Sequence, residues 1–170
     1  MIKYQCMSAF NVGDTVMHFR EGLAHITEIR RMNEKDYFII RVVRDESEII
    51  YVPVDTAQAV IRHVSSQEQA EELIIYIRDI QPEYITNTKQ RRDGFKRRLG
   101  SGNIHDLAFL ARQLYFFTHP EEIAVPVKFG PADVEMLKYA TTTMYDELAI
   151  TYNINRSEIE SLFLAKIKSA

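Results

Sequence analysis

The sequence predicts an α+β protein, in which a small antiparallel β domain precedes an all-α helical domain. Before about residue 65, β-branched and aromatic residues form short runs separated by turn-forming residues, which is typical of a small antiparallel sheet. After that point, apolar residues recur at helical spacing behind capping residues. We therefore expect a β domain at residues 1–64, a bridging helix and linker at 65–82, and a helical domain at 83–170.

Four runs in the first part are predicted to be strands, at residues 14–19, 23–31, 36–43 and 48–54. The third run is apolar on both faces apart from Arg41, so we expect it to lie inside the sheet, where a barrel-like closure would cover both faces. Pro53 has no backbone N–H and is expected at the end of its strand.

The second part is predicted to contain five helices, four of them opened by a residue that favours a helix start. The predicted starts are Ser65 or Ser66 with a capping-box Gln69, a helix over about Thr88–Leu99, and starts at Asn103, Pro131 and Ser157. On the long helix that begins at Pro131, Leu137 and Met144 are expected to face the core. Four acidic residues of that helix are expected to form its solvated face: Asp133, Glu135, Asp146 and Glu147.

Composition excludes several classes of protein. The 170 residues include 21 Lys+Arg and 24 Asp+Glu, giving a net charge of −3, which excludes a globally basic nucleic-acid binder. The 46% of hydrophobic residues excludes disorder as the main state. Apolar runs fall far short of the ~18–20 residues that span a bilayer, and the one cysteine, Cys6, cannot form an internal disulfide. We expect a cytoplasmic protein that does not bind membranes.

One segment departs from this acidic background. Residues 88–98 carry six basic residues against Asp93, a net charge of +5, and such a patch is typical of a surface that meets a phosphate backbone. The turn from Gly100 to Asn103 is expected to add free amides that favour an anion. Phe95 and Leu99 are predicted to anchor this helix in the core. The alternative is a solvated helix whose cations pair with acids of the same domain: Glu83, Asp106, Glu121 or Glu122.

No catalytic constellation stands out in the sequence. The histidines are scattered without metal-ligand spacing, at positions His18, His25, His63, His105 and His119. Gly100 and Gly102 lack the third glycine and the preceding strand of a dinucleotide site, and there is no phosphate-binding loop motif. We therefore expect a binding protein with no cofactor and no metal, rather than an enzyme.

Short motifs in the first part resemble the CarD/CdnL family of bacterial transcription regulators. They are Phe10–Val16, Gly22 with Ala24 and Ile26, Tyr37, Val52–Val54, and Ile61 with Arg62. The N-terminal part of that family is shared with the RNA-polymerase-interacting domain of the transcription-repair coupling factor. The second half agrees in outline, with a basic helix that ends in a Gly-Ser-Gly-Asn turn.

The resemblance implies a Tudor-like β domain that docks on the RNA polymerase β subunit and a helical domain that contacts promoter double-stranded DNA near the edge of the transcription bubble. The matching polymerase-binding residues are Tyr51, Val52 and Pro53. The DNA-binding residues would be Lys89, Arg91, Arg92, Lys96, Arg97 and Arg98, with Arg91 the best match. Thr88 stands where the family commonly has a tryptophan wedge, so either phosphate contacts act alone or another aromatic residue, such as Tyr84, takes its place.

Two functions of different classes follow. The first is a non-enzymatic transcription regulator that binds polymerase and contacts promoter DNA, and so modulates the stability of the open complex. The second is a protein–protein adaptor that binds polymerase or another partner without contacting DNA. In both cases we expect a monomer.

Overall fold

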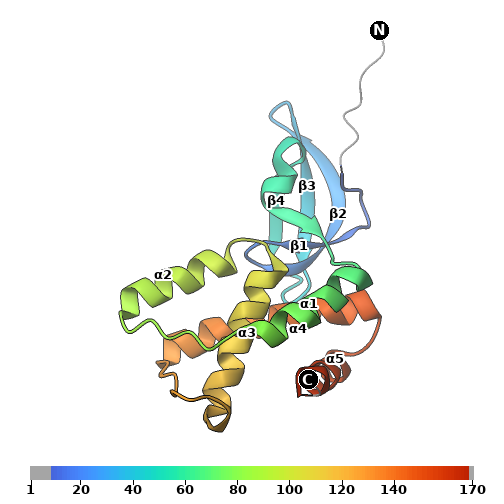
Figure 1. The fold of residues 1–170 in the computed structure, drawn as a ribbon. Coiled ribbons are helices and arrows are strands. Elements are labelled where there is room, and N and C mark those ends of the chain that lie inside the picture. Colours follow the sequence, from blue (N-terminus) through green and yellow to red (C-terminus); the bar gives the residue numbers. More distant parts are fainter. Residues whose placement is uncertain (1–8, 169–170) are drawn as a thin grey trace. The chain divides into compact units, whose positions relative to one another are not determined.

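The computed structural model describes residues 9–168, in which a five-stranded antiparallel sheet precedes five α-helices (Figure 1). This arrangement confirms the predicted α+β class. The chain divides into two units, Met1–His63 and Val64–Ala170, which we call the β unit and the helical unit. Cys6 lies outside the described residues.

The sheet of the β unit has the strand order β4-β3-β2-β1-β5, and each neighbouring pair is antiparallel. Its strands are β1 (Thr15–His18), β2 (Gly22–Met32), β3 (Lys35–Val42), β4 (Ile49–Pro53) and β5 (Ile61–His63). β3 lies inside the sheet and β4 ends at Pro53, as predicted. β5 was not among the predicted strands, because three residues are too few to show a periodic pattern. Among the described strands β4 and β5 do not pair, so they are the two edges of the sheet.

The long hairpin of β2 and β3 depends on a two-residue turn. Met32 pairs with Lys35, and the residues between them, Asn33 and Glu34, have φ values of 48° and 65°. A two-residue turn with left-handed backbone at both positions matches the twist of the flanking strands. The core of this unit is formed by Val16, Ile26, Phe38, Ile40, Val52 and Ile61, and the short 3₁₀ helix η1 (Val54–Ala59) packs against β3, β4 and β5.

The helical unit contains α1 (Gln67–Asp79), α2 (Thr88–Leu99), α3 (Ile104–Thr118), η2 (Pro120–Glu122), α4 (Pro131–Tyr152) and α5 (Arg156–Lys168). The predicted starts of the first four α-helices are confirmed, and Ser66 forms a capping box with Gln69. The predicted start of α5 at Ser157 was wrong, because the helix begins one residue earlier, at Arg156. Ser157 therefore lies inside the helix, and the Glu158 carboxylate accepts the Asn155 N–H at its start.

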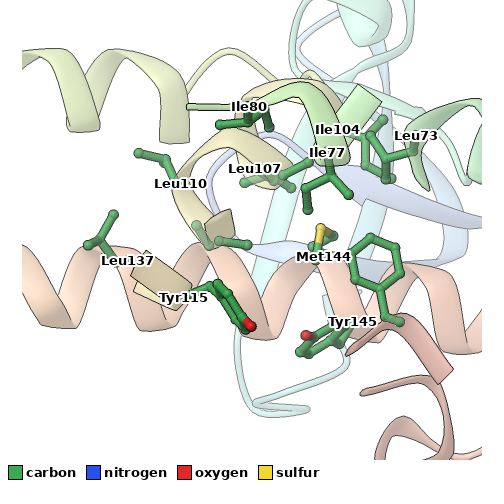
Figure 2. Close-up of a cluster of buried hydrophobic side chains, with 14 of the residues drawn as sticks. Leu73, Ile77, Ile80, Ile104, Leu107, Leu110, Tyr115, Leu137, Met144 and Tyr145 are labelled. Atoms are coloured by element: carbon green, nitrogen blue, oxygen red, sulfur yellow. The ribbon is translucent and has the colours of Figure 1, made fainter. Parts of the chain in front are cut away.

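The core of the helical unit lies between α1, α3 and α4, where Ile77, Leu107, Leu110, Leu137 and Met144 are buried (Figure 2). Helix α1, expected as a bridging helix, contributes four buried side chains to this core: Ala70, Leu73, Ile74 and Ile77. By its contacts it belongs to the helical unit.

Substitution of the α1 cap tests these assignments. Ser66→Ala should lower the free energy of unfolding by about 1 kcal/mol, because the Gln69 N–H loses its acceptor. Ser157→Ala is the matched control and should change it by less than about 0.5 kcal/mol, since Ser157 is an exposed residue inside α5. Urea denaturation followed by far-ultraviolet circular dichroism measures both, and equal losses would contradict the assigned caps.

Candidate functional site

Helix α2 is held by its apolar face. The Asn87 side chain caps it by accepting the Gln90 N–H at 2.9 Å. Phe95 is buried, with its ring centroid 5.8 Å from that of Phe129, and Leu99 packs against the same core. The predicted anchoring role of Phe95 and Leu99 is confirmed, and the side of α2 that faces inward is thereby fixed.

Arg91 lies on this inward side, and its place in the predicted DNA-binding set needs correction. The residue is 5% exposed, and its Nη2 lies 2.8 Å from Oδ2 of Asp133. Its Nη1 donates to the Ile85 carbonyl at 2.6 Å, and its guanidinium carbon lies 5.3 Å from the centre of the Tyr84 ring. A phosphate cannot reach this guanidinium in the described structure, so Arg91 has a structural role here.

Asp133 is the partner that brings Arg91 inward. Its carboxylate is fully buried and accepts hydrogen bonds from Arg91, from Arg92 Nε at 3.1 Å and from the Gly130 N–H at 3.0 Å. Burial alone would raise the pKa of Asp133, but the hydrogen bonds from Arg91, Gly130 and Arg92 outweigh it and hold the pKa below its ordinary value. Asp133 is therefore a buried anion shared by two cations of α2.

The expectation that the acids of α4 form a solvated face was wrong for Asp133 and Glu147, which are both fully buried. Glu147 accepts hydrogen bonds from the backbone N–H and the hydroxyl of Ser65, at 2.9 and 2.7 Å. Asp133, Leu137, Met144 and Glu147 lie on one helical stripe, because they are spaced by four, seven and three residues. That spacing was visible in the sequence and indicated an inward position for both acids.

The other basic residues of α2 fall into two groups. Arg98 pairs with Asp106 and lies over the Phe109 ring, 4.0 Å from its centre, so the alternative of pairing inside the domain holds for Arg98. Arg92 keeps 40% of its side chain exposed. Lys89, Lys96 and Arg97 are exposed, and the structure gives them no ion pair among residues 9–168.

Together the outward-facing cations form one surface. At 100° per residue, Lys89, Arg92, Lys96 and Arg97 fall within about 140° of the helix circumference, with Asp93 among them. We call these four side chains the basic stripe. The space beside Gly94 of α2 is open, because a Cβ atom added to this glycine would meet no heavy atom within 4 Å.

The turn after α2 does not offer the free amides expected of it. The Gly100 N–H donates to the Lys96 carbonyl, the Ser101 N–H to the Arg98 carbonyl, and the Asn103 N–H to the Ser101 hydroxyl. The Asn103 side chain caps α3 by accepting the His105 N–H at 2.9 Å. These amides donate to acceptors of the chain itself, so an anion that binds at α2 depends on the side chains of the basic stripe.

Tyr84 and Thr88 lie at the N-terminal end of α2. Thr88 is its first residue and is exposed. The Tyr84 ring is 39% exposed and lies near both the Arg91 guanidinium and the Phe129 ring, whose centre is 6.1 Å away. Tyr84 is thus an exposed aromatic side chain that contacts the inward side of α2 at Arg91.

The predicted polymerase-binding residues occupy the edge strand β4 and differ in exposure. Tyr51 is 47% exposed, whereas Val52 is buried against Phe38 in the core and Pro53 is half-buried. The side chain of Val52 is therefore a core residue and not a contact, which corrects its inclusion. Arg30 lies beside Tyr51. The pKa of Arg30 is raised mainly by its hydrogen bonds to Glu28, and to a smaller extent by the nearby Tyr51.

The scattered histidines each have a local contact rather than a shared site. The His63 Nε2 lies 2.8 Å from the Ala9 carbonyl, and His119 stacks on Tyr115 at a ring distance of 4.1 Å. Within residues 9–168, no three side chains of His, Cys, Asp or Glu gather in a way that could hold a metal ion. In the same part of the chain, no helix combines the length and apolar character needed to cross a membrane.

Removal of the buried anion tests its role. Asp133→Asn should lower the free energy of unfolding by about 3–5 kcal/mol, because Arg91 would stay buried without a counter-charge. Asp93→Asn, an exposed acid of α2, is the control and should change it by less than about 0.5 kcal/mol. Urea denaturation gives both values. In the double variant Arg91→Met/Asp133→Asn part of the loss should return, and additive losses would contradict the pairing.

Comparison with known families gives one match. The model of the CarD-like/TRCF RID domain matches residues 10–65, the stretch that contains all five strands of the described sheet. RID domains are RNA-polymerase-interacting domains, so the match supports a general role in polymerase binding. The exposed edge strand β4 and the sequence motifs of the β unit agree with it. Residues 10–65 of this chain, and with them its β unit, belong to the CarD-like/TRCF RID domain family.

Proposed function

We propose that this protein is a non-enzymatic bacterial transcription regulator that acts in the cytoplasm. Its β unit binds the β subunit of RNA polymerase, and its helical unit contacts promoter double-stranded DNA near the edge of the bubble and so modulates the stability of the open complex. The observation that carries the proposal is the RID family match on a domain whose edge strand exposes Tyr51.

The edge strand supports the polymerase-binding half of the proposal. β4 pairs only with β3 among the described strands, so one side of its backbone is open to a partner strand. Tyr51 adds an exposed aromatic side chain, the type most enriched at the centres of interfaces. The resemblance to the CarD/CdnL family implies a strand in which a basic side chain often stands at the position of Tyr51, and in this chain Arg30 places a cation beside the tyrosine.

The basic stripe supports the DNA-binding half. Three of its four cations are exposed and make no ion pair within residues 9–168, and such side chains can neutralise phosphates. The stripe is small and the chain has a net charge of −3, so free binding to DNA should be weak. Attachment to polymerase would raise the local concentration of the stripe near promoter DNA, which compensates for its size.

The adaptor function remains the second candidate, and one observation favours it. Three of the six basic residues of α2 are ion-paired inside the helical unit: Arg91, Arg92 and Arg98. If the remaining cations only keep the surface soluble, effects on transcription should not depend on salt or on the charge of α2.

Loss of the Tyr51 ring should weaken polymerase binding. We expect Tyr51→Ala to raise the Kd for RNA polymerase about tenfold or more, because interface aromatics commonly contribute most of the binding energy. Val12→Ala, another exposed apolar residue of the β unit, should leave the Kd unchanged. Biolayer interferometry with purified polymerase measures both, and indistinguishable Kd values would argue against β4 as the contact.

Charge reversal of the stripe should remove the DNA effect and preserve polymerase binding. Lys89→Glu/Lys96→Glu/Arg97→Glu should abolish the change in open-complex lifetime after competitor challenge, because three phosphate contacts become repulsive. The matched control reverses three exposed lysines of α4 and α5, Lys138, Lys166 and Lys168, and should behave like the wild type. The wild-type effect should have a log–log salt slope of roughly −3, since each phosphate contributes about 0.9.

If both triple variants change the lifetime as the wild type does, the adaptor function is supported and the DNA contact is refuted. If the α2 variant also loses polymerase binding, the two units do not divide the work as proposed.

A further inference from the structure

A cavity of about 240 Å³ lies in the helical unit and plays no part in the proposed function. It is bordered by residues of α1, α3, α4 and α5, and most of its lining is apolar, including Ile77, Leu114, Met144, Phe163 and Leu164. Figure 2 shows part of this region, where Tyr115 of α3 and Tyr145 of α4 accompany Met144. The volume is below the ~300 Å³ at which sites for drug-sized ligands begin, so only a small molecule fits.

Arg112 lines the same cavity as a partly buried side chain, and two of its guanidinium nitrogens lack hydrogen-bond partners. Its Nε and Nη1 are shielded from solvent, and no hydrogen-bond acceptor among residues 9–168 reaches either atom. Its guanidinium carbon lies 4.7 and 4.6 Å from the ring centres of Tyr115 and Phe116, so its close neighbours are aromatic faces. Buried donors without acceptors are costly, and the partial burial of this cation lowers the pKa of Arg112, although Tyr115 and the nearby Glu122 act in the opposite sense. Arg91, in contrast, has a carboxylate at 2.8 Å.

The nearby acids do not take the place of a partner. The Glu122 carboxylate accepts the Tyr115 hydroxyl at 2.8 Å, and Glu160 is an exposed residue at the border of the cavity. The Tyr145 hydroxyl has no hydrogen bond among the described residues, and burial, with a contribution from Glu160, raises the pKa of Tyr145 to about 12. This hydroxyl is thus a protonated donor at neutral pH. The cavity combines an apolar wall with a cation and a hydroxyl donor.

We propose that this cavity binds a small organic carboxylate with an apolar body, whose carboxylate accepts hydrogen bonds from Arg112 and Tyr145 while its body lies against Met144, Phe163 and Leu164. The chemistry of the lining favours this class: a neutral ligand would not pair with the Arg112 cation, and an inorganic anion would leave the apolar wall uncovered. The inference is independent of the proposed transcriptional role.

The test uses 3-phenylpropanoate as the probe and its neutral amide as the matched control ligand. In the full chain labelled at methionine and leucine methyl groups, the carboxylate should shift the Met144, Leu114 and Leu164 resonances saturably. The amide should bind at least about tenfold more weakly, because it lacks the charge that Arg112 requires.

Two variants assign the interaction. Arg112→Met should fold, because an apolar side chain of similar length replaces a partly buried cation that packs on two aromatic rings, and it should bind acid and amide equally weakly. Lys128→Met, which removes an exposed charge outside the cavity, should keep the preference for the acid. Should Arg112→Met fail to fold, Tyr145→Phe replaces it and should weaken acid binding severalfold. Equal binding of acid and amide by the wild type, no saturable shift with either, or an Arg112→Met variant that keeps the preference would each overturn the proposal.

Discussion

The buried ion pair between Arg91 and Asp133 determines what helix α2 can present to a partner. Asp133 lies at the start of α4 and receives hydrogen bonds from two cations of α2, so α2 cannot rotate about its axis without leaving a buried carboxylate unpaired. Phe95 fixes the same orientation through apolar contact. The outward position of Lys89, Lys96 and Arg97 is a consequence of these two contacts, and so is the existence of a basic stripe.

The sequence predicted the elements better than the roles of their charges. Caps and helical periodicity located the starts of α1 to α4, because these signals are local, whereas the three residues of β5 carry no periodic signal. A count of charges could not distinguish the buried Arg91 from the exposed Lys89. A spacing argument could have done so: Arg91, Phe95 and Leu99 follow one another at intervals of four, which places Arg91 on the face that Phe95 anchors. Spacing also indicated that Asp133 faces inward, but it could not show that Asp133 meets Arg91, because the two residues lie 42 positions apart on different helices.

In the proposed function, the two units recognise their partners through different physical interactions. The β unit offers an open strand edge and an aromatic ring, whose contribution depends on shape and on burial of apolar surface and changes little with salt. The helical unit offers separate exposed charges, whose contribution falls steeply with ionic strength. Under the proposed function, a specific, salt-resistant attachment combined with a weak, salt-sensitive one would allow an acidic chain to act on DNA only where its first partner is already present.

The helical unit contains two arginines that differ in their partners. Arg91 is buried and has a carboxylate and a carbonyl as hydrogen-bond acceptors, so most of its burial cost is offset inside the fold. Arg112 is partly buried against the Tyr115 and Phe116 rings, which attract a cation but do not act as hydrogen-bond acceptors for its Nε and Nη1. Arg91 is therefore committed to the fold, whereas the Arg112 cation forms no ion pair within residues 9–168 and borders a cavity in which the proposed carboxylate would supply one.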